Sequence, residues 1–222
     1  MRRAGRDAPT QPPVVSELRL GQLAGVDPAE LRPGADLEAV ECAGATLDRL
    51  DLGDALVTTA RLSGLTADEA VLSGARLTEV DLDQVGLTVL RAAGSRWREV
   101  RVSGRVGVLD APGAQWWCVH LTGCRLGYVD LSGAALVDVA LTDCVVDELV
   151  LTGATARRVA LPGTRVHTLS VRDSRLTDVD LRRAALTSVD DVAGLRGATV
   201  GPDQLEMLAP LMAQGLGLRV EP

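Results

Sequence analysis

Residues 134–158 read Ala134-Ala-Leu-Val-Asp, Val139-Ala-Leu-Thr-Asp, Cys144-Val-Val-Asp-Glu, Leu149-Val-Leu-Thr-Gly and Ala154-Thr-Ala-Arg-Arg. The third position of each pentapeptide is apolar, and the first is apolar or small. A period of five is neither the period of about 3.6 residues of an α-helix nor the strict alternation of an ordinary strand. Residues two apart in an extended segment point to the same side. The pattern therefore predicts a recurring short extended piece and a corner, with two side chains directed inward in each unit.

The same unit repeats from residue 35 to residue 188, about two-thirds of the chain. Of its 31 central residues, from Leu37 to Leu186, 18 are Leu and all are apolar. The count loses one residue between Val102 and Val106. Without that loss, the centres at positions 107, 112 and 117 would be Gly, Pro and Trp, which would fill a close-packed core less well. We therefore expect a deletion of one residue at this point.

Four units lie close to the pattern Ala-(Asp/Asn)-Leu-x-x, namely Ala35-Asp-Leu-Glu-Ala, Val80-Asp-Leu-Asp-Gln, Val129-Asp-Leu-Ser-Gly and Val179-Asp-Leu-Arg-Arg. In these units the sequence resembles the pentapeptide-repeat proteins. The resemblance implies an all-β fold, a right-handed four-sided β-helix with four units per coil and short helical caps at its ends. The repeat would then make nearly eight coils. Trp97 and Trp116 would lie on the same side of adjacent coils, each next to a small Ala centre.

The chain is expected to have four parts. Residues 1–13, with three Arg and three Pro, are predicted to be a disordered N-terminal arm. Residues 14–34 are predicted to be an N-terminal cap, in which Asp27-Pro28-Ala29-Glu30 begins a helix with a partial capping box. Residues 35–188 form the β-helix, and residues 189–222 form a C-terminal cap.

The C-terminal cap contains one short amphipathic helix that starts at Pro202 and ends before Gly215. Its apolar stripe consists of Leu205, Leu208, Leu211 and Met212. One interpretation is a lid over the last coil, because a solenoid must close its open core. The other, which the first does not exclude, is a dimerisation element, since some members of the resembling family dimerise through their C-terminal ends.

Composition limits the function classes. The chain has 23 basic residues, all of them Arg, against 30 acidic ones, and a net charge of −7. We expect no direct nucleic-acid binding, because neutralising phosphates requires a basic excess. No run of about 18 apolar residues predicts a membrane span, and no apolar segment near the N-terminus predicts secretion, which favours the cytoplasm. The richness in Arg, Ala, Gly and Val is typical of a bacterial genome of high GC content.

Candidate chemistry is sparse. His120 and His167, the only histidines, are predicted to point outward from different sides, so no catalytic dyad is expected. Cys124 and Cys144 occupy the same slot one coil apart, which favours buried thiols, with a disulfide as the alternative. We find no spacing typical of a metal site, a phosphate-binding loop or a catalytic triad. We therefore expect no metal, no cofactor and no enzymatic activity.

Charge alternates in bands along the repeat. The segment from Arg91 to Arg105 contains five Arg and one Glu, between two acidic segments. Arg91, Arg96, Arg101 and Arg105 each precede a centre in successive units, so they should form a belt around one coil. The belt either balances the charge of neighbouring coils through salt bridges or forms a docking band for a partner protein.

Three functions remain open. We favour a non-enzymatic protein-interaction scaffold with an unidentified partner. The resemblance implies an alternative, a DNA mimic that binds DNA gyrase or topoisomerase IV and protects against fluoroquinolones, which would require sustained negative charge along the rod. The first coils alone have sustained negative charge, and bands of Arg interrupt it further along, so this interpretation is not favoured. The third alternative is an enzyme or small-molecule binder on the outer face.

Overall fold

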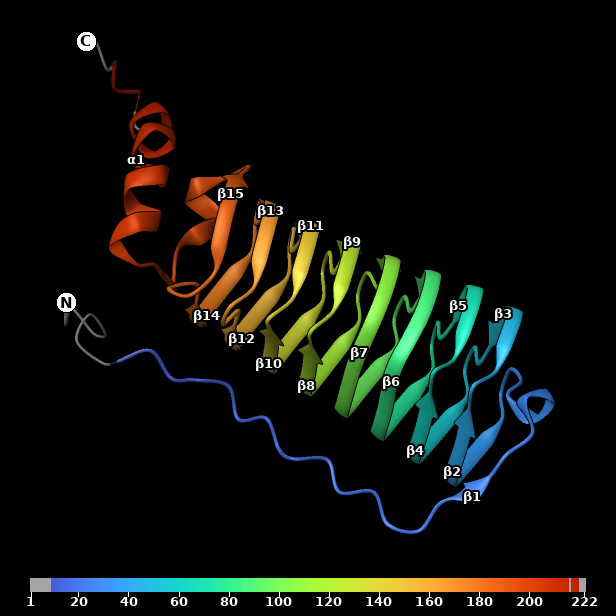
Figure 1. Ribbon diagram of the computed structural model, residues 1–222. Helices are drawn as coiled ribbons and strands as arrows, with labels where there is room; N and C mark the ends of the chain where they lie inside the picture. Colours follow the sequence, from blue (N-terminus) through green and yellow to red (C-terminus); the bar gives the residue numbers. More distant parts are fainter. Residues whose placement is uncertain (1–8, 216, 220–222) are drawn as a thin grey trace.

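The computed structural model describes residues 9–215 and 217–219, and parallel β-strands make up most of this range (Figure 1). The two 3₁₀-helices are η1 (Pro28–Glu30) and η2 (Val192–Leu195), and the α-helix is α1 (Pro202–Gly215). The strands are β1 (Ala24–Gly25), β2 (Asp36–Ala43), β3 (Thr46–Asp51), β4 (Leu56–Ser63), β5 (Thr66–Val71), β6 (Arg76–Arg91), β7 (Arg96–Asp110), β8 (Gln115–Thr122), β9 (Arg125–Asp130), β10 (Ala135–Thr142), β11 (Val145–Val150), β12 (Thr155–Ala160), β13 (Arg165–Ser170), β14 (Arg175–Asp180), β15 (Ala185–Val189) and β16 (Ala198–Thr199).

Each strand pairs in parallel with the strand one coil away. One stack has the order β1-β2-β4-β6-β7-β8-β10-β12-β14-β16, and a second contains the odd-numbered strands from β3 to β15 together with β6. Partners such as Leu37 and Val57 are 20 residues apart, which corresponds to four pentapeptides. The chain is therefore a parallel β-solenoid of about nine turns. The repeat alone predicted nearly eight, and the short strands β1 and β16 extend the stack beyond it.

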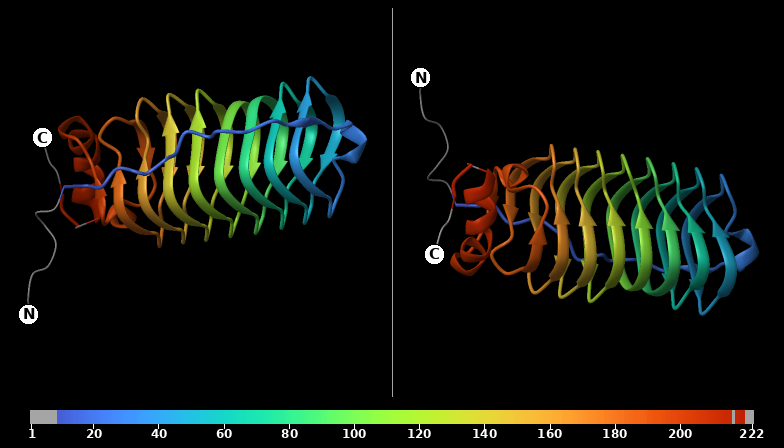
Figure 2. Two further views of the ribbon diagram at one scale, coloured as in Figure 1. Left: turned by 90° about the horizontal axis from the view of Figure 1, so that it is seen from below. Right: turned by 90° about the horizontal axis from the view of Figure 1, so that it is seen from above.

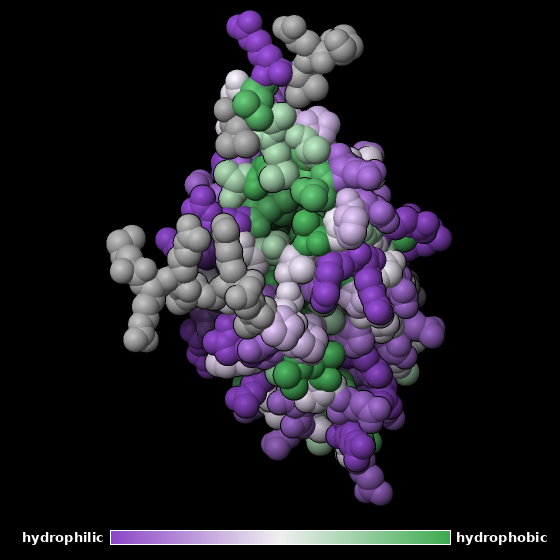
Figure 3. All heavy atoms as spheres, turned by 90° about the vertical axis from the view of Figure 1, so that its left-hand side faces the viewer, coloured by the Kyte–Doolittle hydropathy of each residue, from purple (hydrophilic) through white to green (hydrophobic). Residues whose placement is uncertain are grey.

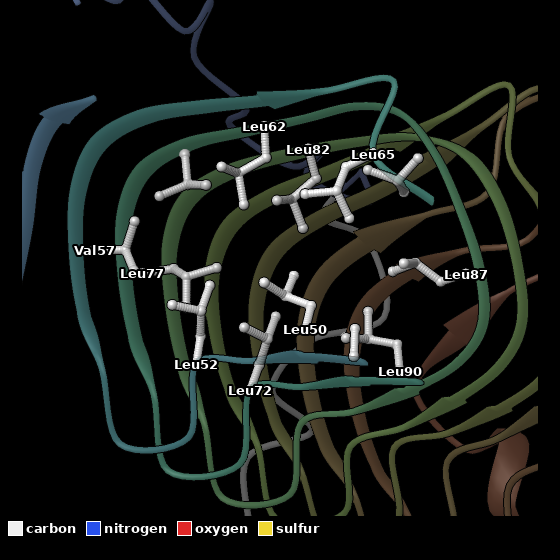
Figure 4. Close-up of a pocket in the computed structure, with 13 residues that line it drawn as sticks. Leu50, Leu52, Val57, Leu62, Leu65, Leu72, Leu77, Leu82, Leu87 and Leu90 are labelled. Atoms are coloured by element: carbon white, nitrogen blue, oxygen red, sulfur yellow. The ribbon is translucent and has the colours of Figure 1, made fainter. Parts of the chain in front are cut away.

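One coil defines the four sides of the rod. We number them by the centres Leu77 (side 1), Leu82 (side 2), Leu87 (side 3) and Ala92 (side 4), and each side continues through the residues stacked on these. Figure 4 shows the labelled Leu side chains pointing into the interior from different sides. Two small apolar voids of about 20 Å³ each remain between these columns of Leu and Val. The solenoid interior is therefore a packed core and not a channel.

The predicted deletion is present. Between β6 and β7, Leu82 is paired with Val102, but Val85 is paired with Gly104, so the offset falls from 20 residues to 19. Gly104 has a φ of +113°, and a Cβ atom there would lie 2.2 Å from the carbonyl oxygen of Val85. Only glycine fits where the shorter coil crosses its neighbour this closely.

The two Trp centres stack as expected. Trp97 pairs with Trp116 in the ladder, and their ring centroids are 4.8 Å apart with planes inclined by 12°. Both are almost fully buried, and the neighbouring centres Ala92 and Ala111 are 0 % exposed. Small Ala side chains beside the rings leave the volume that two indoles need.

The N-terminal segment differs from the expected arm and cap. Residues 1–8 of the predicted disordered arm lie outside the described residues. Residues 9–23, which we call the strap, run extended along the length of the rod rather than across its end (Figure 2). From Thr10 to Ala24 the strap spans about 46 Å at about 3.3 Å per residue, close to the height of nine stacked coils at about 4.8 Å each. Only the region of η1 covers the first coil, and there Asp27 and Glu30 form the capping box.

After β15, the C-terminal part of the chain consists of η2, β16 and α1. Leu208 is 2 % exposed and packs against the last coil, whereas Leu205 and Met212 are 50 % and 40 % exposed. The predicted stripe is thus divided between a buried and an exposed surface. None of the described helices has the length and apolar character needed to cross a membrane.

Candidate functional site

The structure separates the four residues of the predicted Arg belt. Arg91 lies on side 4 and pairs with Glu69 at 2.7 Å and with Asp110 at 3.6 Å. The remaining members are dispersed over the other three sides, Arg96 on side 1, Arg101 on side 2 and Arg105 on side 3.

Arg101 is held by a carboxylate of the preceding coil. Its Nε and Nη2 donate to the two Asp81 oxygens at 3.0 and 2.5 Å, and Asp81 is 1 % exposed. Arg61 approaches the same carboxylate from the other side, at 3.5 Å. The hydrogen bond to Asp81 raises the pKa of Arg101. Within the belt, Arg91 and Arg101 therefore balance charge inside the rod, while Arg96 and Arg105 have no ion-pair partner among the described residues.

A more continuous surface appears along side 1. Outward-pointing residues of successive coils stack here. The ladder pairs are Arg76–Arg96, Arg98–Trp117, Trp117–Val137 and Val137–Arg157, and Val137 is half-buried. Trp117 is 59 % exposed. We call the exposed members of this surface the Trp117 face. It consists of Arg76, Arg96, Arg98, Trp117, Arg157 and Arg175.

The Trp117 face has basic ends and an uncharged middle. Between Arg98 and Arg157 the outward positions of side 1 are held by Gln115, Trp117, Ala135, Val137 and Thr155. No acidic residue occupies an outward position of this side from Arg76 to Arg175. Five ladder steps separate these two Arg, a distance of about 24 Å at about 4.8 Å per step. The arrangement places an apolar anchor between two positive regions.

From Glu79 to Asp178, acidic residues hold four of the six positions at the corner between sides 1 and 2, and Cys118 and Arg158 hold the other two. The four acidic residues are Glu79, Glu99, Asp138 and Asp178. Asp138 is 4 % exposed and accepts from Arg158 Nε at 2.6 Å and from the backbone N–H of Val14 at 2.9 Å. The Arg158 hydrogen bond lowers the pKa of Asp138 below its ordinary value. A continuous negative polymer on the Trp117 face would pass beside this acidic edge.

Among the described residues, no hydrogen bond joins a histidine to a cysteine. His167 is exposed, whereas His120 is half-buried and its Nε2 lies 2.9 Å from Thr142 Oγ1. Cys124 and Cys144 are free thiols, each 1 % exposed. The hydrogen bond with Cys144 and burial raise the pKa of Cys124, which disfavours its thiolate. Among the described residues, no group of three or more His, Cys, Asp or Glu could hold a metal ion.

The C-terminal end carries an apolar groove. A hollow of about 490 Å³ lies between η2, β16 and α1. Its lining includes Val192, Leu195, Val200, Leu205 and Met212. Figure 3 looks at this end and shows hydrophobic residues gathered within a hydrophilic surround.

The five-residue unit and the 20-residue parallel coil define the class of protein, a pentapeptide-repeat β-solenoid. Three solved structures of QnrB1, a plasmid-mediated fluoroquinolone resistance protein, are similar to this chain, at low identity and low TM-score. The full-length form is 14% identical, with 85% of this chain and 94% of that chain covered and a TM-score of 0.29. Two trypsin-treated variants are 16% and 19% identical, with TM-scores of 0.32 and 0.26. They cover 84% and 89% of this chain, and 100% and 95% of their own chains. No family model and no curated protein matches the sequence.

Sequence reasoning missed the Trp117 face because it followed the charges along the chain. A belt of consecutive units encircles one coil, so its members point in four directions. A surface on one side of a solenoid instead gathers residues about 20 positions apart. Reading every fourth unit would have placed Arg98, Trp117 and Arg157 together, since Trp117 follows the centre Trp116 and points outward.

Proposed function

We propose that the chain is a non-enzymatic protein-interaction scaffold, and that its Trp117 face docks an acidic segment of a partner protein. The observation that carries the proposal is the exposed Trp117, which lies between Arg98 of the preceding coil and Arg157, two coils further along side 1. Large aromatic and Arg side chains dominate the binding energy of protein interfaces. Arg groups at both ends add complementarity to acidic partners and fix their register.

The dimensions of the face describe the partner segment. A span of about 24 Å matches roughly seven residues of extended chain. The segment should carry apolar side chains in its middle, against Trp117 and Val137, and acidic side chains at both ends. The acidic corner beside the face disfavours a uniformly negative polymer such as DNA, because like charges face each other there.

The DNA-mimic alternative requires negative charge on successive coils. From Arg76 to Arg175, side 1 has basic ends and an uncharged middle, and the outward column of side 4 that contains Asp110 and Asp130 also contains Arg91 and uncharged residues. This pattern favours the scaffold over the mimic. A DNA supercoiling assay with gyrase tests the DNA-mimic alternative directly. Inhibition of gyrase at micromolar concentrations of this protein would support that alternative.

The test compares variants of the Trp117 face with a matched control variant on another side of the rod. Immobilised wild-type chain, Trp117→Ala, the pair Arg98→Ser with Arg157→Ser, and Tyr128→Ala would be incubated with host lysate. Tyr128 is a partly exposed aromatic residue near side 3, at 37 % exposure, so it controls for loss of any surface ring. We expect the wild-type chain and Tyr128→Ala to retain a partner protein from the lysate. Neither of the two Trp117-face variants should retain that protein.

A defined probe keeps the test independent of the lysate. A fluorescein-labelled peptide with Asp and Glu at both ends and Leu and Phe in its middle should bind wild type and bind Trp117→Ala at least tenfold more weakly. Raising the salt concentration should weaken binding, because exposed charges are screened over about 10 Å at 0.1 M. Equal binding by all four proteins, or tighter binding of labelled duplex DNA than of the peptide, would contradict the proposal.

A further inference from the structure

The strap is packed less securely than the coils of the rod. None of residues 9–23 is fully buried, although Pro13, Val15, Leu18, Leu20 and Leu23 are half-buried against the rod. Coil residues, in contrast, have inward side chains that are almost fully buried and ladder hydrogen bonds on both sides. Segments with few buried contacts open at low free energy.

The strap is held by a simple geometric match. Among its described residues, two backbone N–H groups donate to the rod, Gln11 to Asp178 Oδ1 at 3.2 Å and Val14 to Asp138 Oδ1 at 2.9 Å. Three residues of extended chain cover about 10 Å, and two coils also cover about 10 Å. An extended segment therefore presents an N–H to the acidic corner at every second coil.

This spacing of strap N–H groups and corner carboxylates does not give a third hydrogen bond two coils further along. Two coils beyond Asp138 the corner residue is Glu99, and three residues beyond Val14 the strap residue is Glu17. Both carboxylates line a cavity of about 530 Å³ between the strap and the rod. The other lining residues include Arg101, Cys118 and His120. The Glu17 side chain is 87 % exposed and its carboxylate lies 3.5 Å from Arg19, so the strap leaves the cavity beside Glu99 unfilled. The ion pair of Glu99 is a long one, at 3.8 Å from Arg98.

We propose that the groove beneath the strap is a docking site for an extended segment of a partner protein, which replaces the strap. The segment carries apolar residues at the strap's spacing, donates backbone N–H groups to Asp138 and Asp178, and has a basic side chain where the strap has Glu17. That side chain enters the cavity and pairs with Glu99. The strap covers the groove until such a segment arrives.

The test uses labelled peptides and the full chain. The first peptide is residues 9–23, the second carries Glu17→Arg, and the third carries both Glu17→Arg and Val14→Pro, which removes the N–H that Asp138 accepts. Each is titrated against wild type and against a full-length variant with Leu18→Asp and Leu20→Asp, whose own strap should leave the groove. We expect the Glu17→Arg peptide to bind the strap variant at least tenfold more tightly than either other peptide. Wild type should bind every peptide more weakly, because its tethered strap competes at high effective concentration.

Two results would overturn the proposal. One is binding of no peptide to the strap variant, and the other is equal binding of the Glu17→Arg peptide with and without Pro at position 14. If the strap variant does not fold, hydrogen exchange of wild type replaces it. Saturating Glu17→Arg peptide should then speed exchange of the Val14 amide, and an unchanged rate would overturn the proposal. The peptides do not involve the Trp117 face, so this test and that of the scaffold function can fail separately.

Discussion

At the scale of the residue, the core contains three buried polar atoms without a hydrogen-bond partner among the described residues. They are Ser95 Oγ, Trp97 Nε1 and Trp116 Nε1. Ser95 is 0 % exposed and belongs to an inward column of side 1, in which its neighbours on the adjacent coils are Ala75 and Ala114. A buried polar group without a partner costs about 1–3 kcal/mol. Ser95 therefore departs from the local pattern at an energetic cost.

Replacing Ser95 by Ala should stabilise the protein. The hydroxyl group is lost, and the remaining methyl group matches the Ala column, so we expect the free energy of unfolding to rise by about 1 kcal/mol. The matched control is Ser174→Ala, because Ser174 lies in the same column and its Oγ donates to the carbonyl oxygen of Gly194 at 3.1 Å. The control should lower stability by about 1 kcal/mol. Urea unfolding followed by circular dichroism measures both, and a loss of stability on Ser95→Ala would contradict the assignment.

Two neighbouring Arg of the predicted belt should respond differently to substitution. Arg101→Ser removes the bidentate partner of buried Asp81 and leaves only the more distant Arg61. We expect a loss of about 1–3 kcal/mol, less than for a fully buried pair because Arg101 is partly exposed. Arg96→Ser should change stability by less than about 0.5 kcal/mol. Equal effects in urea unfolding would show that the Arg101–Asp81 pair adds no stability.

At the scale of the element, α1 has one buried and one exposed surface. Leu208 docks on the last coil, and the Gln204 side chain donates to the carbonyl oxygens of Leu181 and Ala184, where strands can no longer continue the ladder. Both contacts close the core, as an end cap of a solenoid must. Leu205 and Met212 instead project beside the apolar groove of the C-terminal end.

The C-terminal end should join two copies of the chain. In a two-fold contact the same surface of both copies meets, so that surface must offer both a projection and a recess. At this end Leu205 and Met212 are the projection, and the apolar groove beside them is the recess. We expect a dimer in sedimentation-velocity experiments at micromolar concentration. Leu205→Glu with Met212→Glu should yield a monomer of unchanged melting temperature, whereas Leu208→Ala should lower stability by about 2–4 kcal/mol. A wild-type monomer would contradict this prediction.

At the scale of the whole molecule, periodicity made the solenoid predictable, whereas the strap and the Trp117 face depend on contacts between distant residues. The five-residue period fixed which side chains point inward, so the Trp97–Trp116 stack and the deletion near Gly104 followed from counting. The strap has no repeat, and its path depends on carboxylates such as Asp138 and Asp178, which lie far from it in the sequence. The Trp117 face becomes visible only when residues about 20 positions apart are aligned in one column, because the charged neighbours of Trp117 come from other coils.

Stability of the whole rod should fall as the pH decreases below about 6.5, and His120 is the reason. Burial, with the nearby charge of Arg101, lowers the pKa of His120 from its ordinary value of 6.5. Arg101 faces it from the preceding coil, and Glu17 of the strap lines the same cavity. Above pH 6.5 both folded and unfolded chains are neutral at this site, whereas at lower pH the unfolded chain binds the proton more readily. His120 therefore begins to favour unfolding as the pH falls below 6.5.

Thermal melting at pH 7.5 and pH 5.5 measures this effect, with a decrease of about 2–4 °C expected for each kcal/mol lost. His120→Gln should remove most of the decrease over this interval, because its amide does not titrate. His167→Gln is the control, since His167 is exposed on side 3 and should leave the decrease unchanged. The carboxylate of Asp138 cannot account for the interval. The pKa of Asp138 is lowered from an ordinary value of 3.8, so its contribution to stability persists until the pH falls below that value. A decrease that survives His120→Gln would place the titrating group elsewhere on the rod.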